Sequence, residues 1–314
     1  MNLRSQSIAK STYSQSLTIL FKLLVSLSLV VLFPINAMLQ TLYFGVVADV
    51  QYCDCINTNS RFYTESPDRL REAIDTFNTQ EMEFVISLGD IIDRDWESFD
   101  HILPIFESSL APTYHVLGNH EFSVIDEKKN QVVTRLGMSD KYYDFAISGW
   151  RFIVLDANDL SKKAYPVDTP EYLESDSLFR QISALGLPQA REWNGGISEK
   201  QLQWLTQQLE DATKKQQHVL VFSHMPVAPE SSLNLWNNTQ VMDLLENFDN
   251  VKAFFAGHNH RGSYTKKGGI HHLTFNGMVD SPDQNAFAII KLSEEQITIH
   301  GFDRQPGFVL DIQK

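Results

Sequence analysis

The segment 43-YFGVVADVQ-51 joins an apolar run to two polar residues, Asp49 and Gln51. Short runs of apolar and β-branched residues favour buried strands, so we expect a strand from Tyr43 to Ala48 that stops at Asp49. Strands that finish in polar residues at their carboxyl ends are where open α/β sheets bind ligands. This segment therefore predicts an α/β fold with a site at one edge of its sheet.

The same pattern returns along the chain. Further apolar runs end in acidic, amide or imidazole residues: 84–88 before Gly89-Asp90, 114–117 before Gly118-Asn119-His120, 151–155 before Asp156, 218–222 before Ser223-His224 and 253–255 before Gly257-His258. Helical periodicity at Pro67–Phe77 and Ser198–Leu209 places helices between the strands, with Ser198 as an N-cap. Residues 271–309 alternate as antiparallel strands do. We expect a single α/β domain over residues 42–305.

Charge and cysteine content limit the partners and the covalent architecture. The chain has 26 Lys and Arg residues against 39 Asp and Glu residues, a formal net charge of -13. This balance disfavours nucleic acid and anionic membranes as partners, because both are held through phosphate charge. The two cysteines, Cys53 and Cys55, are separated by one residue, which is too close for an ordinary unstrained disulfide. We therefore expect no disulfide framework.

Residues 1–37 differ in character from the rest of the chain. Basic residues precede an apolar run from Leu23 to Phe33, and Pro34 and Ala37 follow it. This arrangement is typical of a secretory signal peptide and predicts export to the periplasm or the extracellular space. Two alternatives remain open. Translation that starts at Met38 would leave the protein in the cytoplasm, and an uncleaved membrane anchor would need an apolar span of about 20 residues.

The strand-end residues together form a set of metal-ligand types. Every candidate is a carboxylate, an amide or an imidazole: Asp49, Gln51, Asp90, Asn119, His224, His258 and His260. These donors suit Mn, Mg, Fe or Zn, and the lack of thiolates argues against a structural zinc site. Asp49 and Gln51, like His258 and His260, are two apart on an expected extended chain, so the side chains of each pair face the same way. Because a carboxylate such as Asp90 can span two ions with its two oxygens, we expect two metal sites.

These short sequence motifs occur in an order that resembles the pattern of a known family. The chain reads Asp-Val-Gln at 49–51, Gly-Asp at 89–90, Gly-Asn-His-Glu at 118–121, Ser-His at 223–224 and Gly-His-Asn-His at 257–260. It resembles the calcineurin-like metallophosphoesterases, whose pattern is D-x-H, GD, GNH[DE], a later H, and GHxH. Gln51 stands where most of the superfamily has histidine, and this glutamine is typical of the manganese-dependent ADP-ribose/CDP-alcohol diphosphatases. An amide oxygen is a harder donor than imidazole, which shifts metal preference toward Mn²⁺ or Mg²⁺.

The resemblance implies a four-layer α/β/β/α sandwich with a binuclear centre for two divalent ions, Mn²⁺ ahead of Mg²⁺, Fe or Zn²⁺. One ion would be held by Asp49, Gln51, Asp90 and His260, and the other by Asp90, Asn119, His224 and His258. A metal-activated water would hydrolyse the diphosphate bond of ADP-ribose and CDP-alcohols, giving a nucleoside monophosphate and a phosphorylated sugar or alcohol. His120 would stabilise the transition state and protonate the leaving oxygen, and Asp93 or Glu121 would orient its ring.

Candidate contacts for a small nucleoside diphosphate substrate lie outside these phrases. Arg61 can pair with a diphosphate through its guanidinium. The loop Trp193-Asn194-Gly195-Gly196 offers an aromatic face and close backbone approach to a nucleobase. Tyr264, near the last phrase, is a further candidate.

Other functions remain open at this point. One is a phosphodiesterase or phosphatase of the same fold that acts on cyclic nucleotides or lipids, and another is a non-catalytic scaffold. Scaffolds of this kind lose ligands or the histidine after the asparagine, whereas Asn119-His120 is intact. The oligomeric state does not follow from the sequence.

Overall fold

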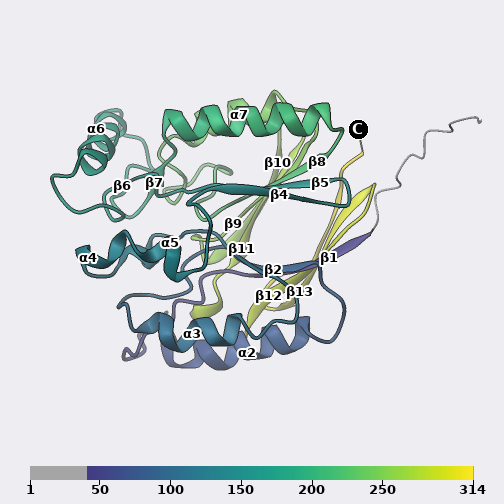
Figure 1. Cartoon of the computed structure of the whole chain (residues 1–314), viewed down its shortest axis with the longest axis horizontal. Helices are drawn as coiled ribbons and strands as arrows, with labels where there is room; N and C mark the ends of the chain where they lie inside the picture. Colours follow the sequence, from purple (N-terminus) through teal and green to yellow (C-terminus); the bar gives the residue numbers. More distant parts are fainter. Residues whose placement is uncertain (1–40, 314) are drawn as a thin grey trace, which may run out of the picture. The chain divides into compact units, whose positions relative to one another are not determined.

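The computed structural model describes residues 41–313, and the expectations about residues 1–37 lie outside this part of the chain. Two six-stranded sheets pack face to face, with helices on both outer faces (Figure 1). No helix among residues 41–313 is long and apolar enough to span a membrane.

The first sheet contains the strand expected from the opening segment. Its strands are β1 (Leu42–Val47), β2 (Phe84–Ser87), β3 (Thr113–His115), β12 (Ala286–Leu292), β13 (Gln296–Asp303) and β14 (Phe308–Asp311), in the order β14-β13-β12-β1-β2-β3. β1 is parallel to β2 and antiparallel to β12. β14 pairs with β13 and lies beyond residue 305, where the sequence places the end of the domain.

The second sheet supplies the remaining strand ends of the site. Its strands are β4 (Tyr143–Ile147), β5 (Trp150–Val154), β8 (His218–Ser223), β9 (Val251–Ala256), β10 (Arg261–Lys267) and β11 (Ile270–Asn276), in the order β10-β11-β9-β8-β5-β4. β11 runs parallel to β9, so only part of the expected C-terminal antiparallel pattern is present. β6 (Leu160–Ser161) and β7 (Gly195–Gly196) form a separate two-stranded sheet.

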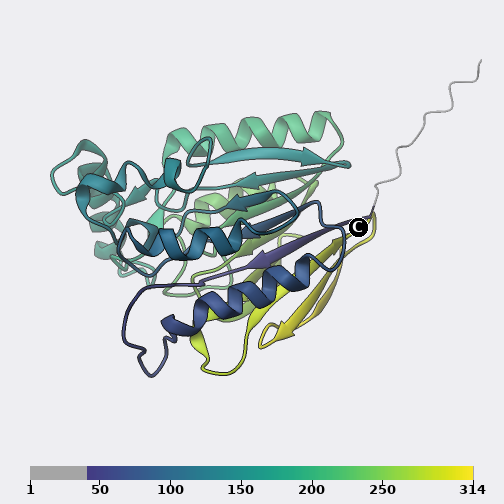
Figure 2. The ribbon, with the colours of Figure 1, turned by 60° about the horizontal axis from the view of Figure 1, so that its bottom comes forward.

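Helices cover the outer face of each sheet (Figure 2). α2 (Ser66–Phe77) and α3 (Ser98–Phe106) pack on the first sheet, and α7 (Glu199–Lys214) and α8 (Asn238–Glu246) pack on the second. The shorter α4 (Asp126–Lys129) and α5 (Val132–Arg135), and α6 (Pro170–Ala184), belong to the connections. Short 3₁₀ helices stand at η1 (Tyr63–Glu65), η2 (His120–Phe122) and η3 (Met278–Asp280).

Three apolar clusters hold these layers together. One lies between the two sheets and includes Phe44, Phe84, Phe152 and Phe222. The other two lie between each sheet and its helices. The layers therefore form the α/β/β/α sandwich that the resemblance implies.

The structure corrects the expectation about the cysteines. Cys53 and Cys55 form a disulfide, with their Cα atoms 5.2 Å apart. A fully extended chain puts residues two apart at about 7 Å, so a bend between them is enough to reach the usual range for bridged cysteines. Cys53 is buried against Tyr63 and Val279.

Candidate dimetal active site

The predicted ligands converge where strands of both sheets end. Asp49 follows β1, Asp90 follows β2, His224 follows β8 and His258 follows β9. All seven candidate ligands are buried, with relative exposures of 9% or less. Each pair of neighbouring strands here, β1 with β2 and β8 with β9, is parallel, so their carboxyl ends meet at one edge.

The backbone at these strand ends is not extended, contrary to expectation. Asp49, Gln51, Asp90 and His258 all have positive φ angles, of 51°, 45°, 55° and 66°. Non-glycine residues adopt this left-handed region at a cost of order 1–3 kcal/mol each, and such residues gather at functional sites. Although the backbone is not extended, the side chains of Asp49 and Gln51 still face the same way, because both contact Nε2 of His260. His258 and His260, in contrast, face different partners.

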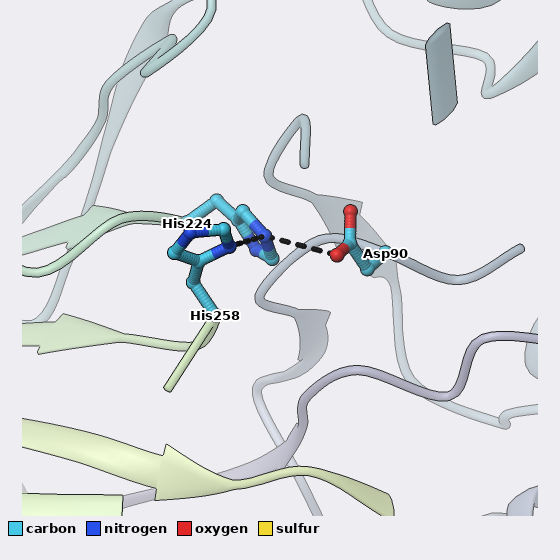
Figure 3. Close-up of side chains that lie close together, drawn as sticks. All are labelled: Asp90, His224 and His258. Atoms are coloured by element: carbon cyan, nitrogen blue, oxygen red, sulfur yellow. Dashed lines mark hydrogen bonds and ion pairs between the residues drawn. The ribbon is translucent and has the colours of Figure 1, made fainter. Parts of the chain in front are cut away.

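Asp90, His224 and His258 form the first group of ligands (Figure 3). Nε2 of His224 lies 3.1 Å from Oδ2 of Asp90 and 3.2 Å from Nδ1 of His258. Nδ1 of His224 donates to the carbonyl of Leu88 at 2.8 Å, which leaves Nε2 as the atom that faces the group.

Asp49, Gln51 and His260 form the second group. Nε2 of His260 lies 3.1 Å from Oδ1 of Asp49 and 3.4 Å from the amide nitrogen of Gln51. That amide nitrogen also lies 3.2 Å from Oδ2 of Asp90, the same oxygen that faces His224. Oδ2 of Asp90 therefore lies between the two groups and contacts a member of each. Its other oxygen accepts the backbone N–H of His120 at 2.7 Å.

The arrangement fits two cations. The side-chain oxygens of Gln51 and Asn119 are buried and have no hydrogen-bond partner among the described residues. Unsatisfied buried oxygens are costly in protein interiors, and a bound ion is one partner that would satisfy them. Together with two carboxylates and three inward-facing imidazole nitrogens, these oxygens form a donor set that suits Mn²⁺, Mg²⁺, Fe or Zn²⁺.

The carboxylates of the site favour positive charge beside them. Burial lowers the pKa of His224, but the Asp90 carboxylate outweighs it and raises that pKa to about 10. Burial likewise lowers the pKa of His260, and Asp49 raises it to about 9. Burial and the neighbouring His224 both lower the pKa of His258. The Asp90 and Asp49 carboxylates therefore stabilise positive charge at these positions, as they would stabilise a bound cation.

Glycine is required where the loops meet. A Cβ atom at Gly118 would collide with Oδ1 of Asp90. Any larger residue there would displace the carboxylate that the two groups share, so this glycine permits the close approach of the two strand-end loops.

His120 is more accessible to solvent than the candidate ligands are, with its side chain 25% exposed. Its Nδ1 donates to the backbone carbonyl of Asp93 at 2.7 Å, and the Asp93 carboxylate lies 3.4 Å from the same atom. Of the two residues expected to orient this ring, Asp93 is the one in contact with it. Nε2 is left as the atom that can exchange a proton with a bound molecule.

Glu121 has a different role from the one expected. Its carboxylate accepts the backbone N–H groups of Asp90, Ile91 and Gly118 at 3.0, 2.6 and 2.7 Å. Burial and the nearby Asp90 raise its pKa to about 8. Glu121 therefore ties the loop after β2 to the loop after β3 rather than orienting the His120 ring.

Asp280 is a site residue that the sequence reasoning missed. Its Oδ1 accepts from Nδ1 of His260 at 2.7 Å and from Nη1 of Arg61 at 2.6 Å. Carboxylates commonly orient metal-binding histidines in this way. Its position just after β11, at the same sheet edge as the ligands, was the signal that could have identified it. Arg61 itself lies 2.8 Å from His260 with its side chain 30% exposed, beside the second group.

The four loop residues at 193–196 that were expected to contact substrate differ in their exposure. Trp193 is 45% exposed, so its ring is accessible. Asn194, Gly195 and Gly196 are buried, so none of the three offers an exposed surface to a substrate. Gly195 is needed because a Cβ there would collide with the carbonyl of Ala157.

Tyr264 lies away from both groups of ligands. Its hydroxyl is 3.0 Å from Nδ1 of His271 and its ring packs on Phe308. Within residues 41–313 we find no contact between Tyr264 and a candidate ligand, and this assignment is not supported.

A four-layer sandwich with carboxylate, amide and imidazole donors converging at the strand ends is an arrangement suited to a metal-dependent hydrolase. The model of the calcineurin-like phosphoesterase family matches residues 42–262. The chain belongs to this family, and it is a metal-dependent hydrolase.

Relatives and solved structures agree with this class. The chain is 33% identical to a manganese-dependent ADP-ribose/CDP-alcohol diphosphatase of Oryza sativa subsp. japonica, over 83% of this chain and 91% of the relative. It is 29% identical to the human protein of the same name, over 86% of this chain and 93% of the relative. A solved dimetal phosphatase from Danio rerio superposes with a TM-score of 0.79 at 29% identity, covering 87% of this chain and 99% of that one.

Proposed function

We propose that this protein hydrolyses the diphosphate bond of ADP-ribose and of CDP-alcohols, with Mn²⁺ as its preferred metal. The products are a nucleoside monophosphate and a phosphorylated sugar or alcohol. The proposal rests on one observation: Oδ2 of Asp90 contacts both ligand groups, and Gln51 belongs to the second of them. The names of the relatives, at 29–33% identity, support the substrate class and the metal.

Each ion would have its own set of residues. Asp49, Gln51, His260 and Asp90 would hold one ion, and Asp90, Asn119, His224 and His258 the other. When bound, the two ions would neutralise charge on the phosphoryl oxygens and lower the pKa of the attacking water.

The residues of this chain do the remaining work. His120, held through Nδ1 by the Asp93 carbonyl, presents Nε2 to protonate the leaving oxygen as the phosphorus–oxygen bond breaks. Its backbone is fixed by Oδ1 of Asp90, which keeps the proton donor beside the shared ligand. The Asp280 carboxylate accepts from Nδ1 of His260 and orients that ring. The carbonyl of Leu88 does the same for Nδ1 of His224.

Substrate binding would use the exposed residues near the ligands. Arg61 lies beside His260, where its guanidinium can pair with the phosphate that is not under attack. Trp193 offers an accessible ring for the nucleobase, and stacking of this kind tolerates adenine and cytosine alike.

A substrate panel tests the proposal. Purified protein with Mn²⁺ would be incubated separately with ADP-ribose, CDP-choline, a phosphomonoester and a cyclic nucleotide, and the products separated by chromatography. We expect AMP and ribose 5-phosphate from ADP-ribose. Much faster cleavage of the phosphomonoester or the cyclic nucleotide would reject the substrate assignment and leave the family assignment intact.

A further inference from the structure

Asn194 contacts the site from a distant part of the chain. Its Oδ1 lies 2.9 Å from Nε2 of His258, a residue 64 positions away. Asn194 is fully buried, so this contact does not depend on solvent or substrate.

The orientation of the Asn194 amide is fixed by its other contacts. Nδ2 donates to the backbone carbonyls of Gln189 and Ser232 at 3.0 and 2.9 Å. A carbonyl only accepts, so the nitrogen must face these two oxygens and the amide oxygen must face His258.

This orientation decides the tautomer of His258. Because an amide oxygen only accepts, Nε2 of His258 must carry the hydrogen, and the lone pair of the neutral ring is on Nδ1. Nδ1 is the atom that faces Nε2 of His224, 3.2 Å away in the group shared with Asp90.

We propose that Asn194 is a positioning residue that makes Nδ1 of His258 the metal-binding atom. It acts through His258 and touches neither substrate nor the reacting atoms. The inference rests on the proposed dimetal function, but it concerns metal affinity and tautomer rather than the substrate. A failure of the Asn194 proposal is therefore distinguishable from a failure of the proposed function.

Two substitutions separate positioning from packing. Asn194→Leu removes the acceptor, whereas Asn194→Asp keeps an acceptor for Nε2 and loses the two donations from Nδ2. We expect Asn194→Leu to weaken Mn²⁺ binding by roughly 10- to 100-fold in calorimetry, as is typical when the partner of a metal-binding histidine is removed. Asn194→Asp should bind Mn²⁺ within a few-fold of the native protein even if its melting temperature falls.

Asn234 provides a matched control. It is equally buried, and its Nδ2 donates to two backbone carbonyls, those of Val227 and Pro229, at 3.2 and 2.9 Å. Its amide oxygen contacts no candidate ligand among the described residues. Asn234→Leu should therefore lower stability and leave Mn²⁺ affinity unchanged.

The native protein gives a test that no folding defect can obscure. With ¹⁵N-labelled histidine and chelator, the ring nitrogens of His258, assigned by their loss in His258→Gln, should report hydrogen on Nε2 and none on Nδ1. Hydrogen on Nδ1 would overturn the proposal. Native Mn²⁺ affinity in Asn194→Leu, or an equal loss in Asn194→Asp, would also overturn it.

Discussion

Asp90 lies between the two groups of candidate ligands. One of its oxygens faces both ligand groups, and the other fixes the backbone of His120. Asp49 also links the groups, but only through the backbone N–H of His258, whereas Oδ2 of Asp90 faces side-chain atoms of both groups. Loss of this carboxylate would therefore weaken both proposed metal sites and displace His120, the proposed proton donor, at once.

We expect Asp90→Ala to be the most damaging single ligand substitution. Metal content after dialysis, measured by plasma mass spectrometry, should fall for both ions, because each loses a donor. Asp75→Ala, an exposed aspartate on α2, is the control and should keep the native metal content. Retention of both ions by Asp90→Ala would show that Asp90 is not shared.

His120→Ala should lower kcat by roughly 10²- to 10⁴-fold, as expected for loss of a general acid, without loss of metal. Substrates with good leaving groups should lose less, because their leaving oxygens need less protonation. His300→Ala, an exposed histidine on β13, serves as the control. An equal loss for every leaving group would assign His120 a role other than proton donation.

Metal binding should release protons at neutral pH. The metal-free pKa values of His224 and His260, about 10 and about 9, are raised, so both rings hold protons below those values and lose them to a cation. Mn²⁺ affinity should therefore fall as the pH is lowered from about 9. Calorimetry in buffers of different ionisation enthalpy counts the protons, and binding at neutral pH without proton release would contradict this charge state.

At the scale of elements, the helix α7 illustrates how local sequence stabilises the layers. The Oγ of Ser198 accepts the backbone N–H of Gln201 at 3.2 Å and donates to Asp159. The helix then buries Leu202, Leu205 and Leu209 against the second sheet. This N-cap and this apolar face were both predictable from sequence.

Ser198→Ala should lower the free energy of unfolding by about 1–2 kcal/mol, because the first turn of α7 loses its cap and Asp159 loses a donor. Chemical denaturation measures this change. Ser177→Ala, at an exposed position of α6, should change stability by less than about 0.5 kcal/mol. Equal effects of the two substitutions would show that the cap contributes nothing.

The sequence predicts elements better than it predicts the geometry between them. Apolar periodicity located β1, β2, β8, β9 and α7, and polar residues at strand ends located the ligands. The left-handed backbone at Asp49 and Asp90 did not follow, because it is imposed by the convergence of loops from both sheets. The burial of Asn194 and the position of Asp280 did not follow either, because both depend on contacts with histidines distant in sequence.

At the scale of the whole molecule, two sheets bring together residues from Asp49 to Asp280. All seven candidate ligands lie within four residues of the end of β1, β2, β3, β8 or β9, so the sandwich core positions the site. We expect this core to hold two divalent ions on which turnover depends.

Metal stoichiometry and turnover measured together test this expectation. Metal-free protein would be titrated with Mn²⁺ while bound metal and ADP-ribose hydrolysis are followed in the same samples. We expect two Mn²⁺ ions per chain, and turnover that rises as the sites fill and disappears in excess chelator. Full turnover in excess chelator, with no metal bound, would contradict it.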